Sequence, residues 1–194
     1  MRILKLSQDN FEETIKISLT TLKKGKVLVC PTDTVYGLLS DAENKDSVEK
    51  IFEIKRRDKS KPLAVFVKDI KTAKKLAFID KSQEKFLRNN KITVILEAKD
   101  KKLSPLVYKN NTIGLRIPDY KPLNLILNKF RKPLAQTSAN ISGNGSFFEI
   151  KEVLKEFDGE KMKPDLVIDA GDLLNNKPST IIDLTEKVKK IIRF

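Results

Sequence analysis

The sequence predicts an α/β fold, a single domain (residues 1–194) built on one mixed sheet with flanking helices. Its 194 residues suffice for one well-packed hydrophobic core, and a second independent domain would be crowded. Segments with helical periodicity alternate with short apolar segments along the chain, which is typical of α/β proteins. Several connections are too short for the crossovers that parallel strands require, so we expect antiparallel pairs in the sheet as well.

The first half of the chain begins with a short strand at residues 3–6. Asp9 and Glu12 have the spacing of a capping box, so they predict a helix, which should end at Gly25. The unbroken apolar run 63–67 predicts a strand covered on both faces. The other elements expected here are a strand at 27–30 and helices at 45–57, 69–77 and 82–89, with Asp69 as the cap of the second of these helices.

The second half predicts more strands than helices. Strands are expected at 92–96, 112–117, 166–169 and 179–184, and helices at 122–130 and 149–157. Residues 188–194 close the chain with alternating polar and apolar character. The sequence contains no internal repeat, low-complexity segment or linker, which agrees with one domain.

Composition excludes several kinds of site. The chain has no histidine and a single cysteine, so it can form neither a histidine-based triad nor a metal site built from histidine or clustered cysteine. No apolar run approaches 18 residues and the N-terminal segment lacks the apolar core of a signal peptide, so we expect a cytoplasmic protein without a membrane segment.

The formal net charge of +13 makes polyanions natural partners. The lysines are, however, spread over the whole chain, and a lysine-rich proteome would give the same excess without any such partner. Charge alone therefore leaves nucleic-acid binding open.

A dense basic cluster precedes the buried strand at 63–67. Its members are Lys55, Arg56, Arg57, Lys59 and Lys61. Arginine offers a planar fork that matches phosphate oxygens and lysine a mobile point charge, so the cluster is suited to a phosphate group. The alternative is a solvated helix end, where cations interact favourably with the helix dipole.

Three further segments combine polar groups with strands. Residues 31–38, PTDTVYGL, place hydroxyl groups and a carboxylate after a strand, where ligands bind in open α/β sheets, although an ordinary turn would have the same residues. Residues 136–146, QTSANISGNGS, combine hydroxyls, amides and glycines that can approach an anion. Arg116 interrupts an apolar strand and should be paired, either with an internal carboxylate or with that of a substrate.

These segments together resemble the YrdC/Sua5 family of threonylcarbamoyl-AMP synthases, in the short form that lacks the extra C-terminal domain. The similarity includes PTDTVYGL at 31–38, the K-x-R and K-P-L segments at 55–57 and 61–63, and T-x-x-x-R-x-P at 112–118. It continues with S-A-N at 138–140 and the closing strands DLVIDAG and STIIDL at 165–171 and 179–184. Each motif alone is weak, but the ordered set covers nearly the whole chain.

The resemblance implies a twisted open sheet around a basic concave cavity. It also implies a nucleotidyltransferase that converts L-threonine, bicarbonate and ATP into threonylcarbamoyl-AMP and pyrophosphate. Mg²⁺ would be held through the ATP phosphates. Other proteins, threonylcarbamoyl transferases, would pass the group to adenosine 37 of tRNA, so tRNA itself is a candidate partner.

The resemblance further implies roles for individual residues. Thr32, Arg116 and Gln136 would bind L-threonine, and Lys55 and Arg57 would be catalytic. As members of the basic cluster, Lys55 and Arg57 are also expected to be solvent-accessible. The ATP site would consist of Lys55, Arg57, Lys61, Thr112, Ser138, Asn140, Ser146 and Arg193. Asp33 is a candidate for assisting the metal, but the sequence does not assign it. Phe66 stands where some relatives have a histidine, and we expect it to be part of the core.

Two alternatives differ in kind from the synthase. A double-stranded RNA or tRNA binding module without catalysis would suit the net charge. A carbamoyl-adenylate-forming domain detached from a hydrogenase-maturation protein is the other, but the cysteine-rich segments of such proteins are missing.

Overall fold

A computed structural model describes the chain apart from residues 90, 100, 175–176, 187 and 194. Its strands are β1 (Arg2–Lys5), β2 (Leu28–Cys30), β3 (Gly37–Asp41), β4 (Ala64–Phe66), β5 (Ile92–Glu97), β6 (Tyr108–Lys109), β7 (Thr112–Arg116), β8 (Leu134–Ser138), β9 (Leu166–Asp169), β10 (Thr180–Asp183) and β11 (Lys190–Arg193). Its helices are α1 (Phe11–Lys23), α2 (Lys45–Lys55), α3 (Ile70–Leu76), α4 (Lys81–Leu87), α5 (Lys121–Phe130) and α6 (Ile150–Glu156), with a short 3₁₀ helix η1 (Pro105–Val107).

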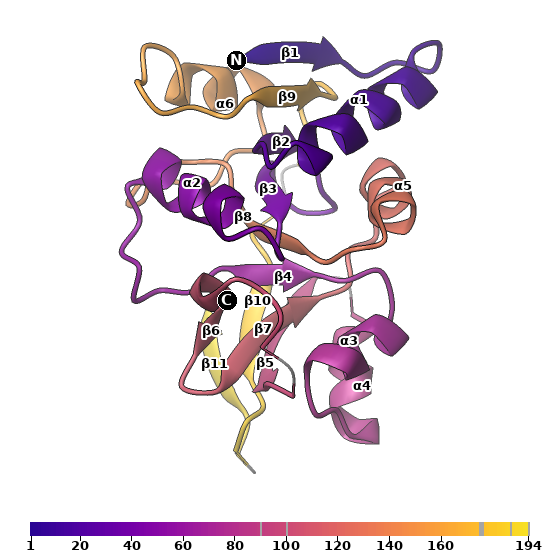
Figure 1. Ribbon diagram of the computed structural model, residues 1–194, viewed down its shortest axis with the longest axis vertical. Coiled ribbons are helices and arrows are strands. Elements are labelled where there is room, and N and C mark those ends of the chain that lie inside the picture. Colours follow the sequence, from indigo (N-terminus) through magenta and orange to yellow (C-terminus); the bar gives the residue numbers. More distant parts are fainter. Residues whose placement is uncertain (90, 100, 175–176, 187, 194) are drawn as a thin grey trace.

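The strands form one mixed sheet in the order β1-β9-β2-β3-β8-β4-β7-β5-β10-β11, with β6 paired to β7. β1 and β2 flank β9 in parallel, whereas β3 and β8 are antiparallel to their neighbours. In Figure 1, β1 and β9 run horizontally, whereas β10 and β11 run nearly vertically, so the sheet is strongly twisted. The expected twisted mixed sheet is therefore confirmed.

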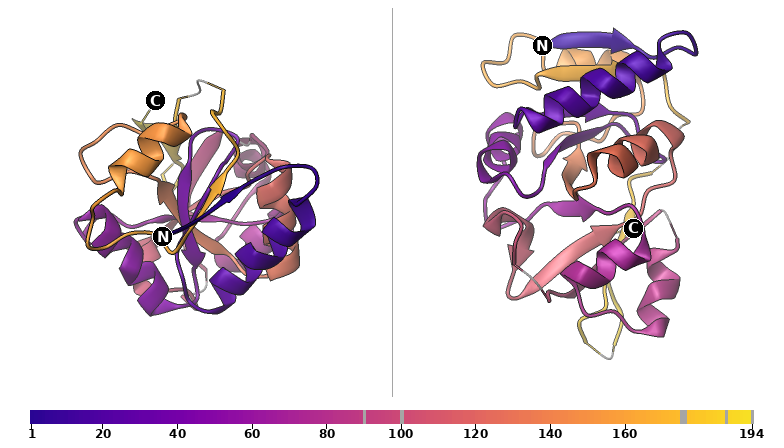
Figure 2. Two further views of the ribbon diagram at one scale, coloured as in Figure 1. Left: turned by 90° about the horizontal axis from the view of Figure 1, so that it is seen from above. Right: turned by 45° about the vertical axis from the view of Figure 1, so that its right-hand side comes forward.

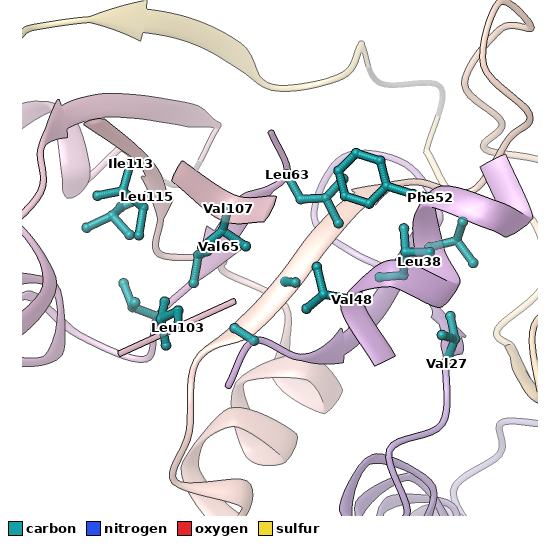
Figure 3. Close-up of a cluster of buried hydrophobic side chains, with 14 of the residues drawn as sticks. Val27, Leu38, Val48, Phe52, Leu63, Val65, Leu103, Val107, Ile113 and Leu115 are labelled. Carbon is teal, nitrogen blue, oxygen red and sulfur yellow. The ribbon is translucent and has the colours of Figure 1, made fainter. Parts of the chain in front are cut away.

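Two apolar clusters cover opposite faces of this sheet, because side chains alternate along each strand. One face packs on α1 and α5 through Leu39, Phe66 and Leu134. The opposite face packs on α2, α3, α4 and α6, and Figure 3 shows part of this cluster, including Val65 and Leu115. In Figure 2 the helices surround the sheet when it is seen from above.

The side chains of β4 and β7 alternate between the two faces of the sheet, which shows which residues lie on the face that α1 and α5 leave uncovered in this half. Val65 lies opposite Leu115 in the cluster beneath α2, so Phe66 and its partner Arg116 point to the other face. That is the face that α1 and α5 cover on the other half of the sheet. Ala64 also lies on this face and is only half-buried. The prediction that residues 63–67 are covered on both faces is therefore wrong at Ala64.

Most predicted helices and strands are present within one or two residues, but the start of α1 and the strands β3, β6 and β8 differ from the prediction. The predicted capping box is wrong: Asn10 precedes α1, and its side chain bonds Ser7 N and Lys5 O instead of capping the helix. Gly25 ends the helix as predicted and adopts the left-handed conformation, with φ of 66°. The sequence also did not predict β3 and β8, because their polar neighbours suggested ligand-binding loops. Phe194 of the predicted closing segment lies outside the described residues.

Among the described residues, no helix has both the length and the apolar character needed to cross a membrane.

Candidate active site

A cavity of about 880 Å³ lies on the open face of the sheet, over β4, β5, β7 and β10. Its polar lining includes Thr32, Thr34, Arg57, Lys61, Thr93, Glu97, Lys109, Thr112, Arg116, Gln136, Ser138, Ser179, Asp183 and Arg193. This volume is within the range of small-molecule sites. The lining includes eight of the predicted site residues: Thr32, Arg57, Lys61, Thr112, Arg116, Gln136, Ser138 and Arg193.

The floor of the cavity follows from strand periodicity. On β7, Thr112, Gly114 and Arg116 face the cavity, while Ile113 and Leu115 are buried in the core on the other side. Gly114 has no side chain, and a Cβ atom at this position would be in ordinary contact with the Ala64 Cβ and a methyl of Thr93, both 3.6 Å away. Small residues therefore lie side by side on the floor of the cavity.

Three arginines from distant parts of the chain converge on the cavity. Arg57 follows α2, Arg116 ends β7 and Arg193 ends β11. Burial lowers the pKa of Arg193, and the positive charges of Arg116 and Arg57 lower this pKa further. The charges of Arg57 and Arg116 thus act unfavourably on that of Arg193, and an anion bound in the cavity would offset this effect.

Arg57 and Arg193 are held by backbone oxygens. Arg57 Nε donates to Lys61 O at 2.8 Å, and its Nη2 donates to Pro62 O at 3.2 Å. Arg193 Nε and Nη2 both donate to Ser179 O, at 3.2 and 2.8 Å. Because carbonyls orient these guanidinium groups without neutralising them, their positive charge is retained in the cavity.

Arg116 pairs with an internal carboxylate, which is one of the two partners that the sequence left open. Its Nη2 lies 2.7 Å from Asp33 Oδ1, and its Nη1 donates to Thr34 Oγ1 at 3.2 Å. The side chains of Arg116 and Asp33 are 3% and 7% exposed, and Asp33 Oδ2 is buried without a hydrogen-bond partner. Burial lowers the pKa of Arg116, and Asp33 opposes this shift.

Phe66 is fully buried in the core, as expected, and its ring centroid lies 5.4 Å from Arg116 Cζ. The guanidinium group is thus in range of a cation–π interaction with this ring.

The segment 31–38 forms a hydrogen-bonded turn before β3. Thr32 Oγ1 donates to Val35 O at 2.7 Å and accepts from Thr34 N at 3.0 Å. This geometry agrees with the ordinary-turn interpretation of Thr32, although the residue also lines the cavity. Its hydroxyl would have to leave the Val35 carbonyl before it could donate to a ligand.

Lys55 is buried, with 2% of its surface exposed, and is not among the described residues that line the cavity. The expectation that it is solvent-accessible is therefore wrong. The last turn of α2 is covered by residues 138–142, and Lys55 Nζ donates to Ser138 O and Asn140 O there. Burial lowers the pKa of Lys55 to about 7, with Arg57 adding to the shift and Glu156 opposing it.

This pKa predicts a pH dependence of stability. Between pH 7 and its ordinary pKa of about 10.4, Lys55 holds a proton only in the unfolded chain, so the free energy of unfolding should rise with pH in this range. Urea denaturation at pH 6, 7, 8 and 9 should show this rise in the native protein and a smaller one in Lys55→Met. Equal slopes for the two proteins would contradict the prediction.

Asn140 and Ser146 also lie outside the described lining of the cavity. Asn140 is 5% exposed, and its amide nitrogen donates to Ile141 O and Asn144 O, both at 2.8 Å. Its polar atoms thus hold the loop together. Ser146 is half-buried further along this loop.

Sequence reasoning missed a pair of buried hydroxyls in the cavity. Thr93 on β5 and Ser179 before β10 are 2% and 5% exposed, and their oxygens lie 2.9 Å apart. The available signal was weak, since Thr93 is the one polar residue within ITVIL and Ser179 opens a predicted strand.

The described residues contain no group of three or more carboxylate, cysteine or histidine side chains that could hold a metal ion.

Comparison with known proteins identifies the family. The family model Sua5/YciO/YrdC, described as "Telomere recombination", matches residues 20–194. A protein of Methanocaldococcus jannaschii, provisionally named a threonylcarbamoyl-AMP synthase, is 38% identical over 95% of this chain and 88% of its own length. The threonylcarbamoyl-AMP synthase of Bacillus subtilis is 30% identical over 89% of this chain but only 50% of its own length.

Solved structures agree with these matches. The Pyrococcus abyssi Sua5 structure complexed with L-threonine has a TM-score of 0.87 and 28% identity, over 99% of this chain and 56% of that one. The structure of Escherichia coli YciO, a protein named as uncharacterized, has a TM-score of 0.84 and 26% identity, over 99% of this chain and 93% of that one. The chain belongs to the Sua5/YciO/YrdC family.

Proposed function

We propose that this protein is an L-threonylcarbamoyladenylate synthase, a nucleotidyltransferase that condenses L-threonine, bicarbonate and ATP. The observation that supports this most is the convergence of Arg57, Arg116 and Arg193 on one cavity, since ATP and the carboxylate of threonine both need cationic partners. The names of the Bacillus and Pyrococcus relatives and the threonine in one Pyrococcus structure support the same activity.

We assign the amino acid to the part of the cavity around Arg116. The guanidinium group would bind the threonine carboxylate, with Thr32 and Gln136 beside it. Arginine carries several N–H donors in a planar fork, so one guanidinium group can bind both Asp33 and the carboxylate of a substrate.

We assign the nucleotide to Arg57, Lys61, Thr112, Ser138 and Arg193, of which Arg57 is the catalytic candidate. The amine of threonine and bicarbonate would first combine, with loss of water, to N-carboxythreonine. A carboxylate oxygen on its new N-carboxy group would then attack the α-phosphorus of ATP, and the bond from that phosphorus to the pyrophosphate oxygen would break. The fixed cations would align the triphosphate and stabilise the charge that moves onto pyrophosphate. Mg²⁺ would enter with ATP, held largely by its phosphates and neutralising part of their charge.

The product is a mixed anhydride that another enzyme must consume. We propose that a threonylcarbamoyl transferase passes the group to adenosine 37 of tRNA in the cytoplasm.

Product analysis tests the proposal. The protein is incubated with ATP, Mg²⁺, L-threonine and ¹³C-bicarbonate, and the nucleotides are separated and identified by mass spectrometry. A threonylcarbamoyl-AMP species that carries the ¹³C label is expected. Unchanged ATP with a protein that binds neither ATP nor threonine would contradict the proposal.

A double-stranded RNA or tRNA binding module without catalysis is the second candidate, favoured by the net charge of +13. Binding of this kind needs no threonine and should weaken steeply as salt is raised. A filter-binding series from 50 to 200 mM salt, with and without ATP and threonine, separates the two functions.

A further inference from the structure

Lys55 stands at the end of α2 but bonds a segment more than 80 residues away. Its Nζ lies 2.7 Å from Ser138 O, 2.5 Å from Asn140 O and 3.1 Å from Asn140 Oδ1. An ammonium group has three hydrogens, and three acceptors surround this one. With 2% of the residue exposed, no hydrogen of Lys55 is left for a ligand in the cavity.

The segment that Lys55 contacts, here loop 138–146, has its own set of hydrogen bonds. Ser138 Oγ lies 2.5 Å from Asn140 Oδ1, the same oxygen that accepts from Lys55. Ser142 N donates back to the backbone oxygen of Lys55 at 2.8 Å, and Glu156 accepts from Ile141 N at 2.6 Å. Lys55 therefore bonds the loop through both its side chain and its backbone oxygen, while Glu156 holds the loop from α6.

The hydrogen bonds between Lys55 and loop 138–146 connect two parts of the cavity lining. Ser138 forms part of its wall at one end, and Arg57 follows Lys55 by two residues at the other. Arg56 lies between them in the left-handed conformation, with φ of 50°, so the chain turns sharply from the buried lysine to the cavity. A shift of Lys55 would move Ser138 and Arg57 relative to each other.

We propose that Lys55 is a positioning residue, which fixes loop 138–146 against the end of α2 and so sets the spacing between Ser138 and Arg57 without touching the nucleotide. This inference rests on the proposed function for its catalytic consequence, but not for its structural one. It differs from the role in direct ATP binding that the sequence motif implied.

Two methionine variants distinguish positioning from direct binding. Lys55→Met keeps the apolar stem and removes every donor, whereas Arg57→Met removes a cation that lines the cavity without bonding the loop. Hydrogen exchange is measured on the ligand-free proteins at pH 6, where Lys55 is protonated, with the amides of Asn140, Ile141, Ser142 and Asn144 as probes. The same samples are assayed for KM of ATP and of threonine.

In Lys55→Met the four probe amides should exchange about tenfold faster or more, since a buried charged hydrogen-bond donor is lost, while the amides of α1 stay unchanged. KM for ATP should rise more than KM for threonine. Arg57→Met should leave loop exchange unchanged. If Lys55→Met does not fold, Lys55→Gln, which retains two donors, should give a smaller acceleration of the same amides.

Unchanged loop exchange in a folded Lys55 variant that has lost ATP affinity would overturn the proposal, because Lys55 would then bind the nucleotide directly. A native protein without synthase activity would refute the proposed function instead. The exchange measurement would still decide whether Lys55 fixes the loop.

Discussion

Arg57→Ala should lower kcat/KM for ATP about 10²- to 10³-fold, equivalent to roughly 2.7 to 4 kcal/mol of transition-state stabilisation. The reason is that Arg57 is half-buried in the cavity and fixed by two carbonyls, so its charge is oriented before ATP binds. Burial lowers the pKa of this guanidinium and Asp58 opposes the shift, but an arginine keeps its charge at any working pH. Steady-state pyrophosphate release measures the effect.

Arg56→Ala provides the matched control. Arg56 is the adjacent arginine, its side chain is 65% exposed and pairs with Glu160 on the surface, and it does not line the described cavity. An exposed pair of this kind contributes about 0 to 1 kcal/mol, so activity and stability should change little. Full activity in Arg57→Ala, or an equal loss in both variants, would remove Arg57 from the active site.

Arg116→Ala should affect both stability and substrate use. The substitution leaves the buried carboxylate of Asp33 without its cation, which should cost about 3 to 5 kcal/mol of unfolding free energy. KM for threonine should also rise roughly 10- to 100-fold, as expected for a lost charged hydrogen bond, and KM for ATP should change less. Urea denaturation and the two KM values measure these effects.

The double variant Asp33→Asn/Arg116→Met separates the two consequences. Removing both charges should restore much of the lost stability, because no buried ion is left unpaired. Threonine affinity should remain low, since the cation that we propose as the partner of its carboxylate is still absent. Recovery of the native KM for threonine in the double variant would show that Arg116 is structural only.

Much of the fold could be predicted from local patterns. The mainly apolar segments that form β5, β7 and β9 are short and bounded by polar residues, so their predicted positions agree closely with the structure. β3 and β8 were missed for the opposite reason. Their ends lie in hydroxyl-rich segments that also suit loops, and only pairing across the sheet, such as Gly37 opposite Ser138, makes them strands.

The candidate site was predictable where a residue violated its local pattern. Arg116 interrupts an apolar strand, which marked it as paired, although the sequence could not choose between Asp33 and a substrate. Lys55 shows the limit: it looks like any basic residue at a helix end, and its burial depends on a loop 83 residues away. The contact of Thr93 with Ser179 likewise joins segments 86 residues apart. No local pattern reports such contacts.

The most direct test of the central claim is pyrophosphate release by the purified protein with ATP, Mg²⁺ and bicarbonate, comparing L-threonine, L-serine and no amino acid. The synthase predicts release that depends on threonine and is much slower with serine or without an amino acid. Release that ignores the amino acid, or no release and no ATP binding under any condition, would contradict it and would make polyanion binding the leading function of this basic protein.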